Sequence, residues 1–237
     1  SGIQIVCQRA NANKLLFRLL RKLAAKMDIK IASVDGGGLR NAIPRECVAT
    51  VLVKSADVES ALAMVAEFEQ VAQAEFAGIE DSISIKAQKT APATQIIPCA
   101  LAKALMAAMV ACPDGVDKMS MAMEGLVQTS NNMARVVSDG SSIKVQTLVR
   151  SSVRSEKEAL ADAIKATLEF AGFDVVLSGS YDGWNPNMES PILKAMLSSY
   201  EALYGKRPAV TAIHAGLECG IIGSNYPGLD MISFGPT

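Results

Sequence analysis

The stretch from Ile29 to Val53, IKIASVDGGGLRNAIPRECVATVLV, decides the fold of this chain. Apolar and polar residues alternate from Ile29 to Val34, as they do in a strand with one buried face. The Asp35–Gly38 run turns the chain, and a second strand is predicted from Cys47 to Val53. Two strands joined by a turn are therefore predicted here.

Helical patterns flank these two strands. Between Ala12 and Met27 the leucines fall on one face and the basic residues fall largely on the other, which predicts an amphipathic helix. A second helix is predicted from Ser55 to Phe76. A strand-like run at Ile3–Cys7 and an alternating run at Ser82–Lys89 complete the order β-α-β-β-α-β, which is the order of a ferredoxin-like unit.

The next part of the chain repeats this order of elements but not its residues. The predicted elements are a helix at 99–111, strands at 125–138 and 141–151, a helix at 155–171 and a strand at 173–177. The Asp139-Gly140 pair between the two longer strands is a strong hairpin signal. We therefore expect tandem ferredoxin-like elements.

The composition changes near Ser178, where a run of turn-forming residues also holds the only tryptophan. We place a domain boundary there, between residues 1–178 and 179–237. A helix at Pro191–Tyr204 and strands at Ala209–Ile213 and Met231–Phe234 are predicted beyond it. Because these elements are too few for a core of their own, the expected fold is α/β (α+β), with a partial α/β domain at the end.

The composition excludes several classes of protein. Half of the residues are hydrophobic and the mean hydropathy is +0.24, so the chain is not globally disordered. A net charge of −1 argues against a nucleic-acid or polybasic membrane partner. No apolar run approaches the roughly 18 residues of a spanning helix, and no signal peptide is visible before Ile3.

The chain has 5 cysteines, an odd number without a C-x-x-C motif. Four of them stand among apolar neighbours, so we expect plain core thiols. This usage of cysteine suits a reducing cytoplasm.

The only histidine, His214, lies four residues before Glu218 in the run HAGLECG. A loop between two apolar strands is a usual place for ligand-binding groups, although His214 equally suits a structural role. Gly216 and Gly220 let the backbone approach a ligand closely, or only turn. One histidine cannot build a metal site made of several histidines.

Two further groups of polar residues are candidates for binding. Asn132 and Arg150 lie on the strands of the predicted hairpin, where arginine can grip a carboxylate and asparagine can donate to an oxyanion. A solvated hairpin face is the alternative. The Arg40–Glu46 run contacts an anion or a partner subunit, or is a plain connection through Pro44.

Five stretches together resemble one family of enzymes. They are Asn11–Leu16, Arg40–Glu46, Leu148–Ser152, His214–Gly220 and Ser233–Thr237. The chain resembles an internal fragment of the aminoacyl-histidine dipeptidase family, also known as cytosol non-specific dipeptidases or peptidase D. That family is part of the dizinc superfamily of aminoacylase, carboxypeptidase G and succinyl-diaminopimelate desuccinylase.

The resemblance implies a zinc-binding α/β catalytic domain that is interrupted by an inserted lid. Residues 1–178 then form the lid, with possible homodimerisation, and residues 179–237 return to the catalytic domain. The two zinc ions activate a water molecule, but their ligands and the general base lie outside the quoted motifs. We therefore expect no metal ligand and no catalytic residue in this chain, which alone is inactive.

The same resemblance carries substrate-binding roles onto five positions: Asn132, Arg150, His214, Gly216 and Glu218. Asn132 and Arg150 match the lid residues that hold the substrate's carboxylate and help to polarise the scissile carbonyl. The implied substrate is a dipeptide, Xaa-His among others. Glu218 replaces a different residue in the desuccinylases, and we hypothesise that it pairs with the free amino group of a dipeptide.

Two other functions stay open. A non-catalytic ferredoxin-like module that binds a small molecule or dimerises fits the order of elements. A metal enzyme built only on carboxylates has little support, because no D-x-D or E-x-x-D cluster ends a strand. The Leu217–Gly220 run and the incomplete segment 179–237 favour the peptidase.

Overall fold

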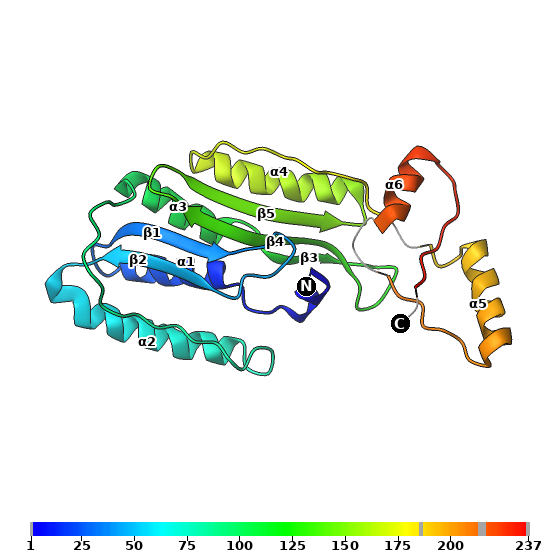
Figure 1. Ribbon diagram of the computed structural model, residues 1–237, viewed down its shortest axis with the longest axis horizontal. Helices are drawn as coiled ribbons and strands as arrows, with labels where there is room; N and C mark the ends of the chain where they lie inside the picture. Colours follow the sequence, from blue (N-terminus) through cyan, green and yellow to red (C-terminus); the bar gives the residue numbers. More distant parts are fainter. Residues whose placement is uncertain (1, 185–186, 213–216, 236–237) are drawn as a thin grey trace. The chain divides into compact units, whose positions relative to one another are not determined.

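The computed structural model describes residues 2–184, 187–212 and 217–235 (Figure 1). Contacts within the chain define two compact units, which are described separately. Unit 1 comprises Ser1–Gly115, Asn131–Leu148 and Asp162–Val176, and unit 2 comprises Val116–Ser130, Val149–Ala161 and Leu177–Thr237. No helix in the described ranges is long and apolar enough to cross a membrane.

Helices and strands alternate along the chain. The helices are α1 (Ala12–Ala24), α2 (Val58–Glu75), α3 (Cys99–Ala111), α4 (Arg154–Phe170), α5 (Pro191–Tyr204) and α6 (Leu217–Asn225), with 3-10 turns at Gly2–Cys7 and Ser55–Asp57. The strands are β1 (Lys30–Gly37), β2 (Cys47–Leu52), β3 (Gly115–Met119), β4 (Val127–Ser138) and β5 (Ile143–Ser151).

The strands form one 5-stranded sheet in the order β2-β1-β4-β3, with β5 also paired to β4. β1 runs antiparallel to both β2 and β4, with Lys30 opposite Leu52 and Asp35 opposite Val137. The two strands predicted in the deciding stretch are thus confirmed. β2 is an edge strand, because β1 is its one neighbour among the described strands.

The hairpin between β4 and β5 closes at Asp139, as the Asp139-Gly140 pair predicted. The Asp139 N–H donates to Ser142 O at 3.1 Å. The Asp139 carboxylate accepts from the N–H groups of Ser141 and Ser142, at 3.0 and 2.7 Å. These two bonds are the main cause that lowers the pKa of Asp139.

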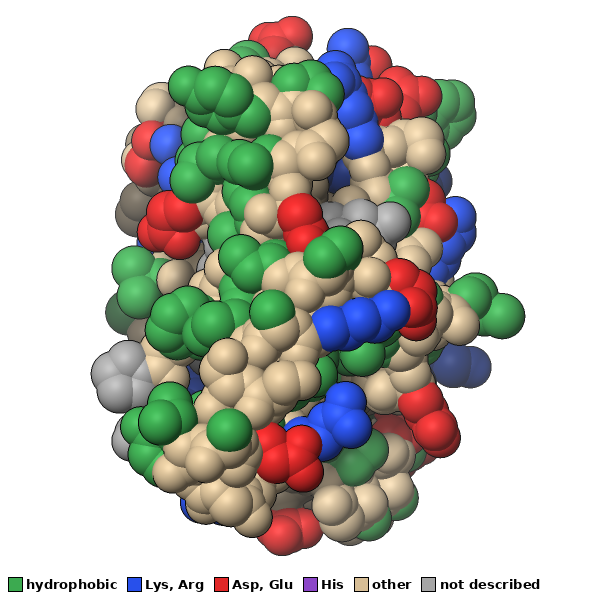
Figure 2. All heavy atoms as spheres, turned by 90° about the vertical axis from the view of Figure 1, so that its right-hand side faces the viewer, with side chains coloured by type: hydrophobic (Ala, Val, Ile, Leu, Met, Phe, Trp, Pro, Cys, Tyr) green, Lys and Arg blue, Asp and Glu red, His purple; other side chains and the backbone are tan. Residues whose placement is uncertain are grey.

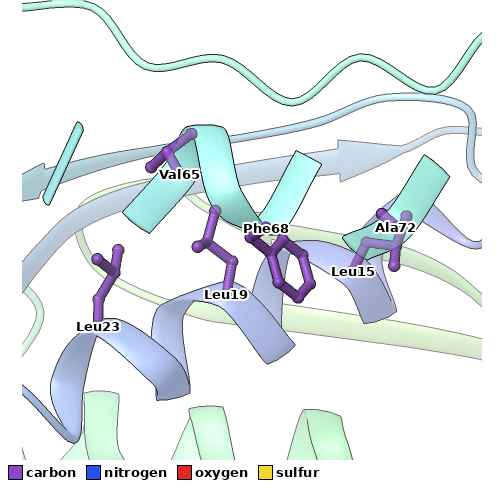
Figure 3. Packing of buried hydrophobic residues seen from close by; sticks show 6 residues of the cluster. All are labelled: Leu15, Leu19, Leu23, Val65, Phe68 and Ala72. Atoms are coloured by element: carbon purple, nitrogen blue, oxygen red, sulfur yellow. The ribbon is translucent and has the colours of Figure 1, made fainter. Parts of the chain in front are cut away.

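A hydrophobic cluster in unit 1 joins α1 to α2 (Figure 3). The apolar face predicted for α1 supplies three leucines, and α2 supplies an aromatic ring and two small side chains; these are Leu15, Leu19, Leu23, Val65, Phe68 and Ala72. The Arg18 guanidinium lies 5.5 Å from the centre of the Phe68 ring and pairs with Glu75 at 2.8 Å. The basic face of α1 therefore closes the rim of this cluster.

The side chain of Lys14, a residue of α1, caps the C-terminal end of helix α3. Its ammonium group donates to the carbonyls of Met109 and Val110 at 2.9 Å and to that of Cys112 at 2.7 Å. These carbonyls have no partner within the helix, and a cation there also favours the helix dipole. Burial lowers the pKa of Lys14.

Two predicted strands of the first unit are wrong. Ile3–Cys7 lies in the 3-10 turn, and Ser82–Lys89 has no strand structure. The alternation around Ile83 and Ile85 instead reflects packing against the α1–α2 cluster. The backbone there bonds to side chains of α2: Ile85 N donates to Glu69 at 2.8 Å.

Three later strands are also wrong among the described residues. Phe173–Leu177, residues 209–212 and Met231–Phe234 have no strand structure, and Ile213 lies outside the described residues. A strand exists only beside a hydrogen-bonded neighbour, and none is paired with these segments in the described ranges. The helix predictions at 99–111, 155–171 and 191–204 are confirmed within a residue.

The fold is therefore α/β, with helices packed beside an antiparallel sheet, as expected. The expectation of four core cysteines is wrong. Cys112 is buried, Cys47 and Cys219 are half-buried, and Cys7 and Cys99 are exposed. Apolar neighbours in sequence do not bury a residue at the end of a turn or at the start of a helix. Burial raises the pKa of the Cys112 thiol to about 11.

Candidate functional site

The strand β4 carries an unusual run of buried polar residues, Thr129 to Asn132. Burying a polar group is costly unless it finds a hydrogen-bond partner. Each of Thr129, Asn131 and Asn132 has such a partner, and these partners come from other segments of the chain. The run therefore marks a part of β4 whose buried side chains bond to segments far along the chain.

Side chains hold the backbone of β4 at Met133. The Met133 N–H donates to the Asp114 carboxylate at 2.7 Å. The Met133 carbonyl accepts from Asn11 at 3.2 Å and from Asn13 at 3.1 Å. Since the Asn11 side chain also caps α1 through the Asn13 N–H at 3.0 Å, the start of α1 is tied to β4.

Asp114 is a member of this site that the sequence did not single out. It receives hydrogen bonds from Met133 N and from Asn11, the latter at 3.1 Å. Burial raises the pKa of Asp114. Acidic residues often follow the end of a helix, so the position of Asp114 in the sequence does not reveal that its carboxylate is desolvated.

Asn132 is buried and holds a loop in unit 1. Its amide nitrogen donates to Arg40 O at 3.0 Å and to Ala42 O at 2.8 Å. Both amide hydrogens are thereby engaged, and the side-chain oxygen has no hydrogen-bond partner among the described residues. The donor role expected of Asn132 thus requires that one of these two bonds opens.

The loop held by Asn132, residues 39–46, is also fixed at its end. Ala12 N donates to Pro44 O at 3.1 Å, and Gly37 N donates to Glu46 O at 3.0 Å. The two arginines of the loop are exposed and make no ion pair within the described ranges. The backbone of this loop is therefore set by internal bonds, while its charges face solvent.

Arg150 stands on β5 in unit 2, where it is half-buried. The Arg150 side chain has no ion pair and no hydrogen bond among the described residues. The acids that follow it in sequence are engaged elsewhere: Glu158 pairs with Arg154 at 2.9 Å, and Glu156 bonds to other side chains. A partly desolvated guanidinium without a carboxylate partner has the chemistry to bind an anion.

Glu156, in the first turn of α4, accepts several hydrogen bonds. Gln128 reaches both of its oxygens at 3.0 Å, Thr129 donates at 2.5 Å and the Lys118 ammonium lies at 3.4 Å. The bond from Thr129 is the largest cause that lowers the pKa of Glu156. The hydroxyls of Thr129 and Ser151 are 2.8 Å apart.

The junction between β5 and α4 is held in the same way. Ser152 N donates to Gln128 O at 3.1 Å, and Val153 N donates to the Ser151 hydroxyl at 3.0 Å. Gly183 packs on this junction, because an added Cβ would lie 2.3 Å from Ser151 O. The chain end of β5, beside Arg150, is therefore enclosed by other segments of unit 2.

Glu218 is exposed in the first turn of α6 and has no partner among the described residues. His214 and Gly216 lie outside the described residues. The loop expected through Gly220 is instead helical from Leu217. Gly220 serves packing, since a Cβ there would lie 2.4 Å from Asp182 O.

Within 2–184, 187–212 and 217–235, no three His, Cys, Asp or Glu side chains come together in a way that could hold a metal ion. These residues do not fit the zinc ions that the resemblance implies.

This chain is similar to known peptidases. Residues 3–80 match the peptidase dimerisation domain family. The whole chain is 32% identical, over 237 residues, to the cytosol non-specific dipeptidase of Escherichia coli (strain K12) and spans 49% of that protein. The crystal structure of aminoacylhistidine dipeptidase from Vibrio alginolyticus superposes on 97% of this chain with a TM-score of 0.91 and 36% sequence identity. This chain covers 47% of the Vibrio alginolyticus chain.

The chain is therefore a homologue of cytosol non-specific dipeptidase, which confirms the resemblance seen in the quoted motifs. It spans about half the length of the relatives that it matches.

Proposed function

We propose that this chain is the lid, residues 1–178, and an adjoining catalytic segment, residues 179–237, of a cytoplasmic dipeptidase. Homology along the whole chain to a dipeptidase supports the proposal. The zinc ions and the general base belong to the part of the protein outside this chain, which alone is inactive. The residues of this chain bind and enclose the dipeptide.

The observation that carries the proposal is the unpaired Arg150. A dipeptide has a free carboxylate one residue from the scissile bond. A guanidinium grips such a group through two parallel hydrogen bonds, which favours dipeptides over longer peptides. Because Glu156 and Glu158 are engaged by other side chains, neither competes for Arg150.

Replacing Arg150 by alanine in the full-length protein should raise the KM for dipeptides and lower kcat/KM about 10- to 100-fold, the range for a lost charge-assisted hydrogen bond. C-terminal dipeptide amides should change little, because they lack the carboxylate. Steady-state kinetics on both substrates test this. The control is Arg207→Ala, which removes an exposed arginine of unit 2. An equal loss on acid and amide contradicts the role.

Glu218 is proposed to pair with the free amino group of the dipeptide. Its exposed carboxylate at the start of α6 has no competing cation among the described residues. Glu218→Gln should raise the KM for dipeptides by about 5-fold, consistent with one partly exposed ion pair of about 1 kcal/mol. N-acetylated substrates should not respond to the substitution. An unchanged KM for dipeptides sinks the hypothesis.

A homodimer through residues 3–80 is also proposed, since these residues match a peptidase dimerisation domain. The edge strand β2 offers a surface for it. Its outer side presents unpaired backbone groups, and Val48 on it is 67% exposed. An exposed strand edge pairs readily with a second chain.

Val48→Lys should convert this dimer to a monomer, because a charge on the edge opposes strand pairing. Light scattering after size exclusion measures the mass. Met121→Lys is the matched control, as Met121 is 98% exposed but lies outside residues 3–80. A Val48→Lys protein that stays dimeric places the interface elsewhere.

The helices α5 and α6 of unit 2 keep hydrophobic side chains at the surface. Figure 2, which looks onto the right-hand side of Figure 1, shows groups of hydrophobic side chains among scattered charges. Leu203, Tyr204, Ile221 and Ile222 are exposed large hydrophobic residues of these helices. Exposed apolar surface of this kind marks a contact, and we propose that the rest of the protein covers it.

A non-catalytic dimerisation module remains the second candidate, because the family match at residues 3–80 concerns dimerisation and not hydrolysis. Dipeptide hydrolysis by the full-length protein decides between the two. Turnover of free dipeptides supports the peptidase. A protein that dimerises but hydrolyses no dipeptide supports the module.

A further inference from the structure

We infer that Thr129 and Glu156 are positioning residues, which hold the end of β5 so that Arg150 faces the dipeptide carboxylate. The inference rests on the proposed function of Arg150. It adds a role for a polar cluster, Gln128, Thr129, Ser151 and Glu156, that lies within unit 2.

The hydroxyls of this cluster form a directed chain. Glu156 is an ionised acceptor, since hydrogen bonds lower its pKa, so the Thr129 hydroxyl must donate its one hydrogen to Glu156. The Ser151 hydroxyl, 2.8 Å away, must then donate to Thr129. Its oxygen in turn accepts from Val153 N at 3.0 Å. Each group therefore has one orientation.

The chain of bonds ends beside Arg150. Ser151 is its neighbour along β5 and is buried. Because successive side chains of a strand point to opposite faces, an inward Ser151 sends Arg150 to the other face. Fixing the Ser151 side chain thus fixes the direction in which Arg150 leaves the strand.

A second bond sets the position along the strand. The backbone carbonyl of Gln128 accepts from Ser152 N at 3.1 Å, and its side-chain amide donates to Glu156 at 3.0 Å. Glu156 therefore links β4, the end of β5 and the start of α4. Exposed ion pairs contribute little to stability, so the ion pair of Glu156 with Lys118 at 3.4 Å is a minor addition to these hydrogen bonds.

The test is a double-mutant cycle in the full-length protein, with free dipeptides and their C-terminal amides as substrates. Thr129→Val removes the hydroxyl and should raise the KM for free dipeptides about 10-fold, a coupling of about 1.4 kcal/mol. The kcat and the kinetics on amides should stay within about 2-fold. Thr129→Ser keeps the hydroxyl and should restore the KM.

Combined with Arg150→Ala, Thr129→Val should have no further effect on KM, because it acts through Arg150. Thr167→Val is the matched control, since the Thr167 hydroxyl donates to Ala163 O within α4. Additive effects, or equal losses on acids and amides, overturn the inference. A shared fall in all rates with a lower Tm indicates a merely structural role and also overturns it.

Failure of the proposed function is seen separately, as absence of dipeptide turnover by the wild type. Hydrogen exchange then decides on the positioning cluster. Loss of the Thr129 hydroxyl should speed exchange of the Val153 amide about 10-fold, equal to an opening cost lower by about 1.4 kcal/mol. Thr129→Ser should leave it slow. An unchanged rate in Thr129→Val overturns the inference.

Discussion

Replacing Gly37 by alanine is expected to lower the free energy of unfolding by about 4 kcal/mol, a value at the upper end for single substitutions. Gly37 has a φ of +74°, which L residues rarely adopt, and this alone costs about 1–2 kcal/mol. An added Cβ would also lie 1.9 Å from the Ala134 carbonyl oxygen. Since that atom belongs to the backbone of β4, relief of the clash separates β1 from β4.

Two other glycines separate the cost of the positive φ from the cost of the clash. Gly78 has a φ of +79° but no atom within 4 Å of an added Cβ, so Gly78→Ala reports the cost of the backbone alone. Gly38 has neither feature, and Gly38→Ala should be close to neutral. Urea denaturation of the three variants measures the order Gly37, Gly78, Gly38. A Gly37→Ala loss no larger than that of Gly78→Ala contradicts the clash.

Truncation of Phe68 to alanine is expected to cost about 3–5 kcal/mol, the usual range for a buried aromatic side chain. Phe68 is 1% exposed and lies in the centre of the α1–α2 cluster (Figure 3). The loss removes its apolar contacts and leaves a cavity between two helices. Arg18 and Lys22 also lose the ring at 5.5 and 5.6 Å.

Phe170 provides the control for this truncation, because it is 97% exposed at the end of α4. Phe170→Ala should change the free energy of unfolding by less than about 0.5 kcal/mol. Thermal and urea denaturation give both values. If the two substitutions cost the same, the cluster between α1 and α2 does not carry the stability of unit 1.

Local patterns were enough to predict α1 to α5, while α6 was expected to be a loop. The leucine face of α1 is a signal within one segment, and the structure confirms it. The Asp139-Gly140 hairpin is local in the same sense. Strands failed more often, because alternation at residues 82–89 arises equally from packing on a helix.

The candidate site divides in the same way. The sequence named Asn132, Arg150 and Glu218 by residue type and by resemblance. It did not reveal Asp114 or the positioning cluster around Glu156, whose partners come from distant segments such as Met133 and Gln128. Hydrogen-bonded acids of this kind look like surface acids until their neighbours are known.

The sequence by itself determined the α/β class, the two strands within Ile29–Val53, the helices α1 to α5 and the homology to dipeptidases. These depend on periodicity and on motifs that are contiguous in the chain. Only the tertiary structure decided that Asn132 donates to the loop at Arg40 and Ala42, and that Arg150 has no acid partner among the described residues. Whether a polar side chain is spent or available depends on residues far along the chain, because folding alone sets its neighbours.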